Sequence, residues 1–402
     1  MKNIILSILS GLLMIIISVS CGNQVPSKIS QNEAEIITGA DQTDKYVPYL
    51  QGKNVAMAIN NSSTIGSQLS LDSLLALGIN VVKVFTPEHG MRGDNNYDSI
   101  DAKTGIPTIS LFRGKHKPTK EDLAGIDVVI FDKQDVGTRF YTYLATLHYV
   151  MEACAENNVE LLLLDRPNPN DSYVDGPVLE EEFKSFVGLN PVPIVHGMTF
   201  GEYAHMLNGE GWLENGVRCE LKVVEMLNYK HGKPYTLPIK PSPNLNTQQS
   251  ILLYPSLCVF EGTVISEGRG TCMPFQILGH PDFKGVYDFK FTPVSIPTMS
   301  THPKHMNLDC YGIDLRDFDT DIFKKTGRLN LSWVIDMYKA YPDKDGFFRQ
   351  GQDGRYSFDR LAGTDKLRQQ IIAGKTEDEI RKSWEPELSE FKKIREKYLI
   401  YD

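Results

Sequence analysis

The stretch Val81-Val-Lys-Val-Phe-Thr-Pro-Glu-His-Gly-Met-Arg-Gly93 decides the fold predicted for this chain. Its first half is an apolar, β-branched run typical of a buried strand, and the proline and glycine that follow end the strand abruptly. Glu88, His89 and Arg92 therefore come just past the carboxyl end of the strand. Because ligands bind at that end of the strands in an open α/β sheet, the stretch predicts a sheet and a site together.

Segments on both sides of this stretch extend the sheet. Helical patterns at 69–77 and 140–156 separate strand-like runs, and this alternation predicts a parallel sheet with helices between its strands. The strand-like runs lie at 53–59, 81–85, 108–112, 127–131, 160–164 and 220–225. We therefore expect an α/β domain at 46–245. Beyond it, prolines and long Gly- and Ser-containing loops multiply before helices return, which predicts a smaller, mixed α/β domain at 246–402.

Residues 1–20 have the features of an export signal. Lys2 precedes a long apolar run, and small residues lead to Cys21. A cysteine at the cleavage point predicts an exported lipoprotein with a lipid on Cys21, anchored in a membrane and facing the periplasm rather than the cell surface. An ordinary signal peptide or a single membrane anchor is the alternative. Residues 21–45 are polar and lack apolar periodicity, so we expect a flexible tether.

Charge and cysteine content exclude several classes of protein. The formal net charge of −9 gives no electrostatic reason to expect nucleic acid as a partner. The cysteines after Cys21 are odd in number and lack Cys-x-x-Cys spacing, which excludes a zinc ribbon and argues against a disulfide framework. We expect mostly free, buried thiols, although one bridge is possible in an exported protein.

Four predicted strands end in a polar side chain: Asn60, Glu88, Asp132 and Asp165. The carboxyl ends of parallel strands lie along one edge of a sheet, so these residues should converge on one cleft. Any one of them alone could be a helix cap or a turn former. Their number, and the Arg or His that follows three of them within a few residues, favours a ligand site.

Glu88 is the leading candidate for a proton donor or acceptor. A carboxyl group between a proline and a histidine at a strand end is partly desolvated, and desolvation favours the protonated form that general acid catalysis needs. The alternative is that Glu88 only pairs with Arg92.

Three further loops carry candidate side chains. The loop at 132–141 joins a strand to a helix, the loop at 165–169 is stiffened by prolines, and the loop at 260–270 is rich in glycine. Arginine in such loops suits a ligand carboxylate, which it binds through two parallel hydrogen bonds. The candidates on these loops are Asp132, Asp135, Arg139, Tyr141, Asp165, Arg166, Asn168, Glu261, Glu267 and Arg269.

Other common sites are absent from the sequence. The first strand is not followed by Gly-x-Gly-x-x-Gly, so we expect no NAD or FAD. The glycines at 260–270 lack the Lys-Ser/Thr ending of a phosphate loop, and no Gly-x-Ser-x-Gly elbow marks a serine hydrolase. Glu88, His89, Asp94 and His116 could ligate a metal, but their spacing is not diagnostic. We predict neither a cofactor nor a metal.

Long motifs along the chain resemble the NamZ family of exo-β-N-acetylmuramidases. The motifs lie at 85–93, 131–143, 164–169, 176–178, 196–199, 241–244, 254–255, 260–263, 266–271, 361–365 and 373–375. The resemblance implies a Rossmann-like N-terminal catalytic domain, a smaller C-terminal auxiliary domain and a cleft between them. It also implies release of terminal β-linked N-acetylmuramic acid from the non-reducing ends of peptidoglycan fragments, in cell wall recycling, with Glu88 as the leading catalytic residue.

Two positions depart from the family pattern. Lys133 replaces the usual Ile or Leu, and Asn60-Asn61-Ser62 replaces Thr-Asn-Gln. We expect these changes to affect the preferred substrate length more than the reaction.

The chemistry of muramic acid suits these candidates but leaves the mechanism open. Its lactyl carboxylate needs a cation, for which Arg139, Arg166 and Arg269 are candidates. Glu88 would protonate the leaving oxygen while a second carboxylate activates water or attacks the sugar, and the carboxylate separation would distinguish inversion from retention. The candidates for that second carboxylate are Asp135, Asp132 and Glu267. The 2-acetamido group is an alternative nucleophile, and a lipoprotein that binds muropeptides without cleaving them is the alternative function.

Overall fold

The computed structural model describes residues 34–88, 90–93, 99–112 and 114–402. The predicted signal peptide, Cys21, His89 and Asp94 lie outside the described residues. The chain divides into Met1–Glu35 and one compact unit, Ile36–Asp402, which holds all the elements below. In the part of the chain that the structure describes, no helix has the length and apolar character needed to cross a membrane.

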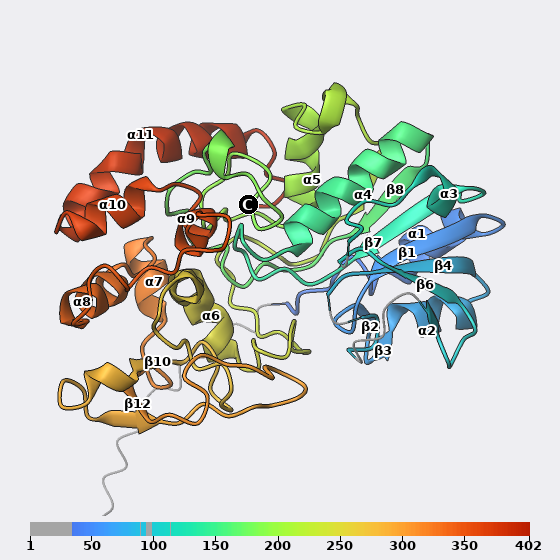
Figure 1. The fold of residues 1–402 in the computed structure, drawn as a ribbon. Coiled ribbons are helices and arrows are strands. Elements are labelled where there is room, and N and C mark those ends of the chain that lie inside the picture. The colour runs from blue at the N-terminus through green and yellow to red at the C-terminus, as the bar shows by residue number, and fades with distance from the viewer. Residues whose placement is uncertain (1–33, 89, 94–98, 113) are drawn as a thin grey trace, which may run out of the picture. The chain divides into compact units, whose positions relative to one another are not determined.

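A seven-stranded sheet forms the centre of the N-terminal half (Figure 1). Six strands are parallel, and β5 pairs with β6 in the antiparallel direction. In spatial order the strands are β5 (Ser99–Ile100), β6 (Pro107–Ser110), β4 (Asn80–Thr86), β1 (Asn54–Ile59), β7 (Val128–Asp132), β8 (Glu160–Leu164) and β9 (Leu221–Val224). The six parallel strands thus follow the Rossmann order 3-2-1-4-5-6, and the predicted α/β fold is confirmed.

The apolar strands are buried on both faces because helices cover each side. Successive residues of a strand point to opposite faces. Ala58, Phe131 and Leu163 pack into a core with α4 (Tyr143–Asn157) and α5 (Phe200–Gly209). Residues of the other face pack with α1 (Thr43–Leu50) and α2 (Ser70–Ala76), and they include Val55, Met57, Ile59, Ile130 and Leu162. The short helix α3 (Lys120–Leu123) precedes β7, and β2 (Thr64–Ile65) pairs with β3 (Gln68–Leu69).

The strand register places the predicted site residues at one edge of the sheet. Ala58 of β1 pairs with both Phe85 of β4 and Phe131 of β7. Asn60 and Glu88, which follow their strands, and Asp132, the last residue of β7, therefore lie at nearly the same level.

Packed structure begins at Ile36, before the predicted boundary near Tyr46. Ile37 pairs with Leu227, and the Gly39 amide donates to the Asp165 carbonyl (2.8 Å). A Cβ atom on Gly39 would lie 2.3 Å from the Val224 carbonyl oxygen, so only glycine fits there. The polar residues at 36–45, which read as a tether, instead form backbone pairs with the sheet region.

The C-terminal half combines a small sheet with short helices, as the predicted mixed α/β region requires. Its antiparallel sheet has the order β10 (Ile277–His280), β12 (Cys310–Asp314), β11 (Phe289–Phe291). Its α-helices are α6 (Gln248–Leu257), α7 (Asp321–Thr326), α8 (Ser332–Ala340), α9 (Ser357–Ala362), α10 (Lys366–Ile372) and α11 (Glu377–Glu396). Among the described residues the 3-10 helices are η1 (Glu181–Phe183), η2 (Glu214–Gly216), η3 (Cys258–Gly262) and η4 (Pro281–Phe283).

The two halves share one hydrophobic core and several long-range polar contacts. Phe131 of the large sheet belongs to the same core as Phe358 of α9 and Phe391 of α11. After α11 the chain reaches the carboxyl end of β8, where the Tyr401 hydroxyl donates to Asp165 Oδ2 (2.8 Å). The last described segment therefore covers part of the sheet edge at which the sequence predicts a site.

Candidate active site

A cavity of about 410 Å³ lies where loops from the sheet edge meet segments of the C-terminal half. Its volume falls in the range typical of small-molecule sites. Aromatic rings form much of its wall, including Phe112, Phe186, Tyr254 and Phe275. Polar side chains also line the cavity, among them Glu88, Tyr141, Tyr143, Asn244, Glu261 and Arg269.

Glu88 lies at the cavity wall beside Tyr143, the first residue of α4. Glu88 is half-buried and follows β4, as predicted. Burial raises the pKa of Tyr143, and the nearby charge of Glu88 raises it further. Asn60 Nδ2 donates to the Tyr143 hydroxyl (2.7 Å), while Tyr141 packs edge-on against that ring at 4.6 Å. Tyr143 thus presents a protonated phenol next to the predicted acid.

Arg269 is the arginine among the three predicted carboxylate binders that reaches the cavity. Its Nε donates to Glu261 Oε1 (2.9 Å), and its guanidinium lies 5.1 Å from the Phe275 ring centroid. Glu267 lies behind it, 3.5 Å from Arg269 and 2.9 Å from Lys304. Burial alone would raise the pKa of Glu267, but the charges of Lys304 and Arg269 outweigh it and hold that pKa below its usual value.

The other two arginines are buried and bound within the protein. Arg139 donates to the carbonyl oxygens of Pro177, Val192 and Leu361 at 2.7–2.9 Å. Arg166 forms an ion pair with Asp132 (Nε to Oδ1, 2.6 Å). Neither side chain lines the cavity.

The remaining predicted residues at this edge are also buried and hold loops together. Burial raises the pKa of Asp165 to about 7, although it accepts hydrogen bonds from the Gly201 amide and Tyr401. Asp135 Oδ2 lies 3.3 Å from His196 Nε2. Asn168 donates to the Met198 carbonyl, and Arg92 forms ion pairs with Asp72 and Asp101.

Sequence reasoning did not single out Tyr143 or Asn244, although both lie in the motifs that resemble the NamZ family. Tyr143 begins a helix and Asn244 lies on a turn, so neither follows a strand directly. A search that weighed every polar residue of those motifs, instead of strand ends alone, would have included both.

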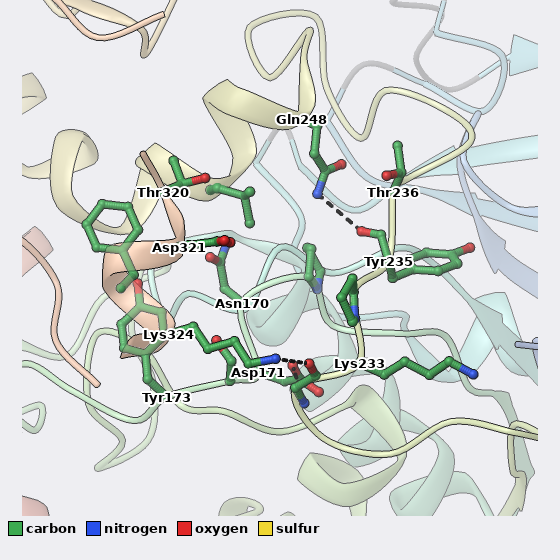
Figure 2. A pocket seen from close by; sticks show the side chains of 16 residues that line it. Asn170, Asp171, Tyr173, Lys233, Tyr235, Thr236, Gln248, Thr320, Asp321 and Lys324 are labelled. Atoms are coloured by element: carbon green, nitrogen blue, oxygen red, sulfur yellow. Dashed lines mark hydrogen bonds between the residues drawn. The ribbon is translucent and has the colours of Figure 1, made fainter. Parts of the chain in front are cut away.

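A second cavity of about 200 Å³ lies between the loop after β8 and α7 (Figure 2). Two charged side chains in its wall, Lys324 and Asp171, bind backbone groups of Gly232. Lys324 Nζ donates to the Gly232 carbonyl (2.6 Å), and the Gly232 amide donates to Asp171 (3.1 Å). Because this cavity contains none of the predicted catalytic residues, we assign the active site to the cavity that Glu88 lines.

No group of three or more His, Cys, Asp or Glu side chains that could hold a metal occurs among the described residues. His116, a weak metal candidate in the sequence, stacks on Phe186 with ring centroids 4.1 Å apart. The five cysteines after Cys21 are free in this structure, and all except Cys272 are buried.

Comparison with known proteins decides the family. Residues 55–249 match the family model described as exo-β-N-acetylmuramidase NamZ, N-terminal, and residues 252–401 match the corresponding C-terminal model. The chain belongs to the NamZ family. The resemblance predicted from the sequence motifs is confirmed, and the protein is a glycosidase.

Individual relatives agree with this family. The peptidoglycan β-N-acetylmuramidase NamZ of Bacillus subtilis is 37% identical, with 100% of both chains covered. A crystal structure of a DUF1343 family protein from Bacteroides fragilis is 45% identical with a TM-score of 0.85, covering 92% of this chain and 99% of that one. A second protein of that family and organism is 28% identical with a TM-score of 0.78, covering 91% and 99%. Membership of an enzyme family argues against the alternative of a lipoprotein that only binds.

Proposed function

We propose that this glycosidase releases terminal β-linked N-acetylmuramic acid from the non-reducing ends of peptidoglycan fragments, with Glu88 as general acid. The observation that carries the proposal is the position of Glu88: among the predicted catalytic carboxylates it is the one that lines the cavity. The name of the Bacillus subtilis relative supports the substrate.

Glu88 would donate its proton to the glycosidic oxygen as the bond to C1 breaks. Its place in the cavity wall beside the phenol of Tyr143 supports this role, because a general acid must lie within hydrogen-bond reach of the leaving oxygen. Once ionised, Glu88 would take a proton from the water that attacks C1 in the second step.

The arrangement favours the 2-acetamido group as the nucleophile of the first step. Asp132 is bound by Arg166, Glu267 is held by Lys304 and Arg269, and Asp135 is buried beside His196. None of these three predicted partners lines the cavity. Glu261 does, but Arg269 binds it. Attack by the acetamido oxygen needs no second enzyme carboxylate, and it predicts retention at C1.

Arg269 would bind the lactyl carboxylate that distinguishes muramic acid from glucosamine. It is charged, it lines the cavity, and its guanidinium lies over the Phe275 ring. Glu261 and Glu267 hold the arginine in place while leaving one guanidinium edge for the substrate.

Turnover of para-nitrophenyl β-N-acetylmuramide by the full chain in detergent tests the proposal, with the glucosaminide analogue alongside. We expect release from the muramide, with β-N-acetylmuramic acid as the first product seen by proton NMR. An α product would indicate inversion and point to Glu261 as the base for water. No release from the muramide would contradict the proposed function.

The lipid anchor on Cys21 remains a separate proposal, since that residue lies outside the described residues. We propose an exported lipoprotein that faces the periplasm. Incorporation of an alkyne-labelled fatty acid into the wild type, and its loss in Cys21→Ser, would support the anchor. Equal labelling of both would contradict it.

A further inference from the structure

Asn244 has a buried amide side chain in the wall of the active-site cavity. Its nitrogen has a hydrogen-bond partner, but its oxygen has none among the described residues. The residue is 5% exposed and lines the cavity. Its Nδ2 donates to the Met299 carbonyl oxygen (3.0 Å). Its Oδ1 is buried and accepts no hydrogen bond from any residue that the structure describes.

Three hydrogen bonds fix the turn that carries Asn244. The Tyr141 hydroxyl donates to the Pro241 carbonyl (3.0 Å), Asn61 Nδ2 donates to the Lys240 carbonyl (3.2 Å), and the Leu245 amide closes the turn onto Ser242 (3.1 Å). Prolines at 241 and 243 fix two φ angles of the segment.

The orientation of the amide is fixed as well. Turning the Asn244 side chain over would bring its Oδ1 against the Met299 carbonyl, where two acceptors would face each other. The carbonyl half of the amide therefore keeps its direction.

An unpartnered buried acceptor destabilises the folded protein, and native proteins rarely keep one without a reason. Four other polar side chains of this wall have partners within the protein: Arg269 binds Glu261, Tyr143 accepts from Asn60, and Tyr141 donates to the Pro241 carbonyl. A ligand that supplies a donor to Asn244 would remove the cost, so binding would depend strongly on that donor.

We propose that Asn244 Oδ1 accepts the N–H of the substrate's 2-acetamido group. This inference rests on the proposed function and makes Asn244 a specificity-determining residue for 2-acetamido sugars. The sugar hydroxyls rotate and can choose other partners, whereas an amide N–H points in one direction, as the fixed acceptor does. The same hydrogen bond would orient the acetamido oxygen toward C1.

Binding of two inert ligands separates this role from catalysis. N-Acetylmuramic acid and 3-O-lactylglucose differ in the 2-acetamido group and both keep the lactyl carboxylate. For the wild-type full chain in detergent, calorimetry should give an affinity for N-acetylmuramic acid on the order of 10- to 100-fold higher. In Asn244→Ala and Asn244→Leu that ratio should fall to near one, while binding of 3-O-lactylglucose stays within a few-fold.

Asn246→Ala is the matched control, because Asn246 lies on the same segment and donates to the Cys272 carbonyl without lining the cavity. It should keep the wild-type ratio. A ratio that survives in a folded Asn244→Ala or Asn244→Leu, judged by an unchanged melting temperature, overturns the inference and leaves the proposed function intact. A wild type that neither cleaves the muramide nor binds N-acetylmuramic acid overturns both.

Discussion

Two regions of the molecule, the cavity wall and a region that we call the sealed edge of the sheet, arise from the same sequence pattern, an acidic residue after an apolar strand. They differ in whether the acidic side chain lines the cavity or is buried. By sealed edge we mean Asp132, Asp165 and Arg166, at the carboxyl ends of β7 and β8. Each acid follows an apolar strand, as Glu88 does. Glu88 lines the cavity, whereas Asp132 and Asp165 are fully buried and bound by Arg166 and Tyr401. The partners that the fold brings to each strand end decide whether its carboxylate is buried or lines the cavity.

The largest expected effect separates the two regions by activity. Glu88→Gln removes the proposed proton donor, so kcat on the muramide should fall by about 10²–10⁴-fold. The melting temperature should stay near that of the wild type, because Glu88 is half-buried at a cavity wall. Steady-state kinetics and a thermal scan check both. Near-normal turnover in the folded variant would remove Glu88 from the mechanism.

The second effect is on stability at the sealed edge. Asp132→Ala leaves Arg166 buried without its carboxylate, which should lower the free energy of unfolding by about 3–5 kcal/mol. Urea unfolding measures it. Asp353→Ala, which breaks the exposed ion pair with Arg360, is the control and should cost under about 1 kcal/mol. A wild-type unfolding midpoint for Asp132→Ala would show that the sealed edge is not held by this pair.

Arg269 should affect substrate choice. Arg269→Met removes the proposed partner of the lactyl carboxylate and keeps a chain that can pack on Phe275. A charged hydrogen bond contributes about 1.5–3 kcal/mol, so kcat/KM for the muramide should fall by roughly 10- to 100-fold. Any cleavage of the glucosaminide should be unaffected. Arg316→Met, which removes an exposed ion pair with Asp314, is the control and should change kcat/KM for neither substrate. Equal losses on both substrates would assign Arg269 a structural role.

The smallest expected effect is on stability, at Lys133. This residue follows Asp132 of the sealed edge and lies near Tyr143 of the cavity wall. Its Nζ is buried without a hydrogen-bond partner among the described residues, 5.3 Å from the Tyr143 ring centroid. Lys133→Met keeps an unbranched apolar stem and should stabilise the fold by about 1–3 kcal/mol at pH 7. Urea midpoints at pH 7 and pH 10 measure the change.

The sign of the pH dependence follows from burial, which lowers the pKa of Lys133 well below its ordinary value of 10.5. The unfolded chain then binds the proton more readily than the folded one, so the wild type loses stability as pH falls below 10.5. The advantage of Lys133→Met should therefore be larger at pH 7 than at pH 10. An equal advantage at both values would mean that folding does not lower the pKa of Lys133.

The sequence predicted what depends on local pattern. Strand runs and their polar ends gave the parallel sheet and placed Glu88 at a ligand edge, and long motifs gave the family. The sequence could not predict which arginine reaches the cavity. Arg139 is turned to structural use by the carbonyl of Leu361, a residue far away in the sequence, and Arg269 has no such contact. The sequence could not select Asn244 either, since the orientation of that amide depends on Met299, far along the chain. Contacts between distant segments decide these roles.

The covering of the sheet edge also has a consequence for the time course of folding. Arg139 meets Leu361 across 222 positions, Asp175 meets Arg381 across 206, and Asp165 meets Tyr401 across 236. A topology rich in such distant pairings folds slowly, because long loops must close before these contacts form. Asp165 acquires its hydrogen bond from Tyr401 only when chain segments more than 200 positions apart have met, so that contact reports a late stage of folding.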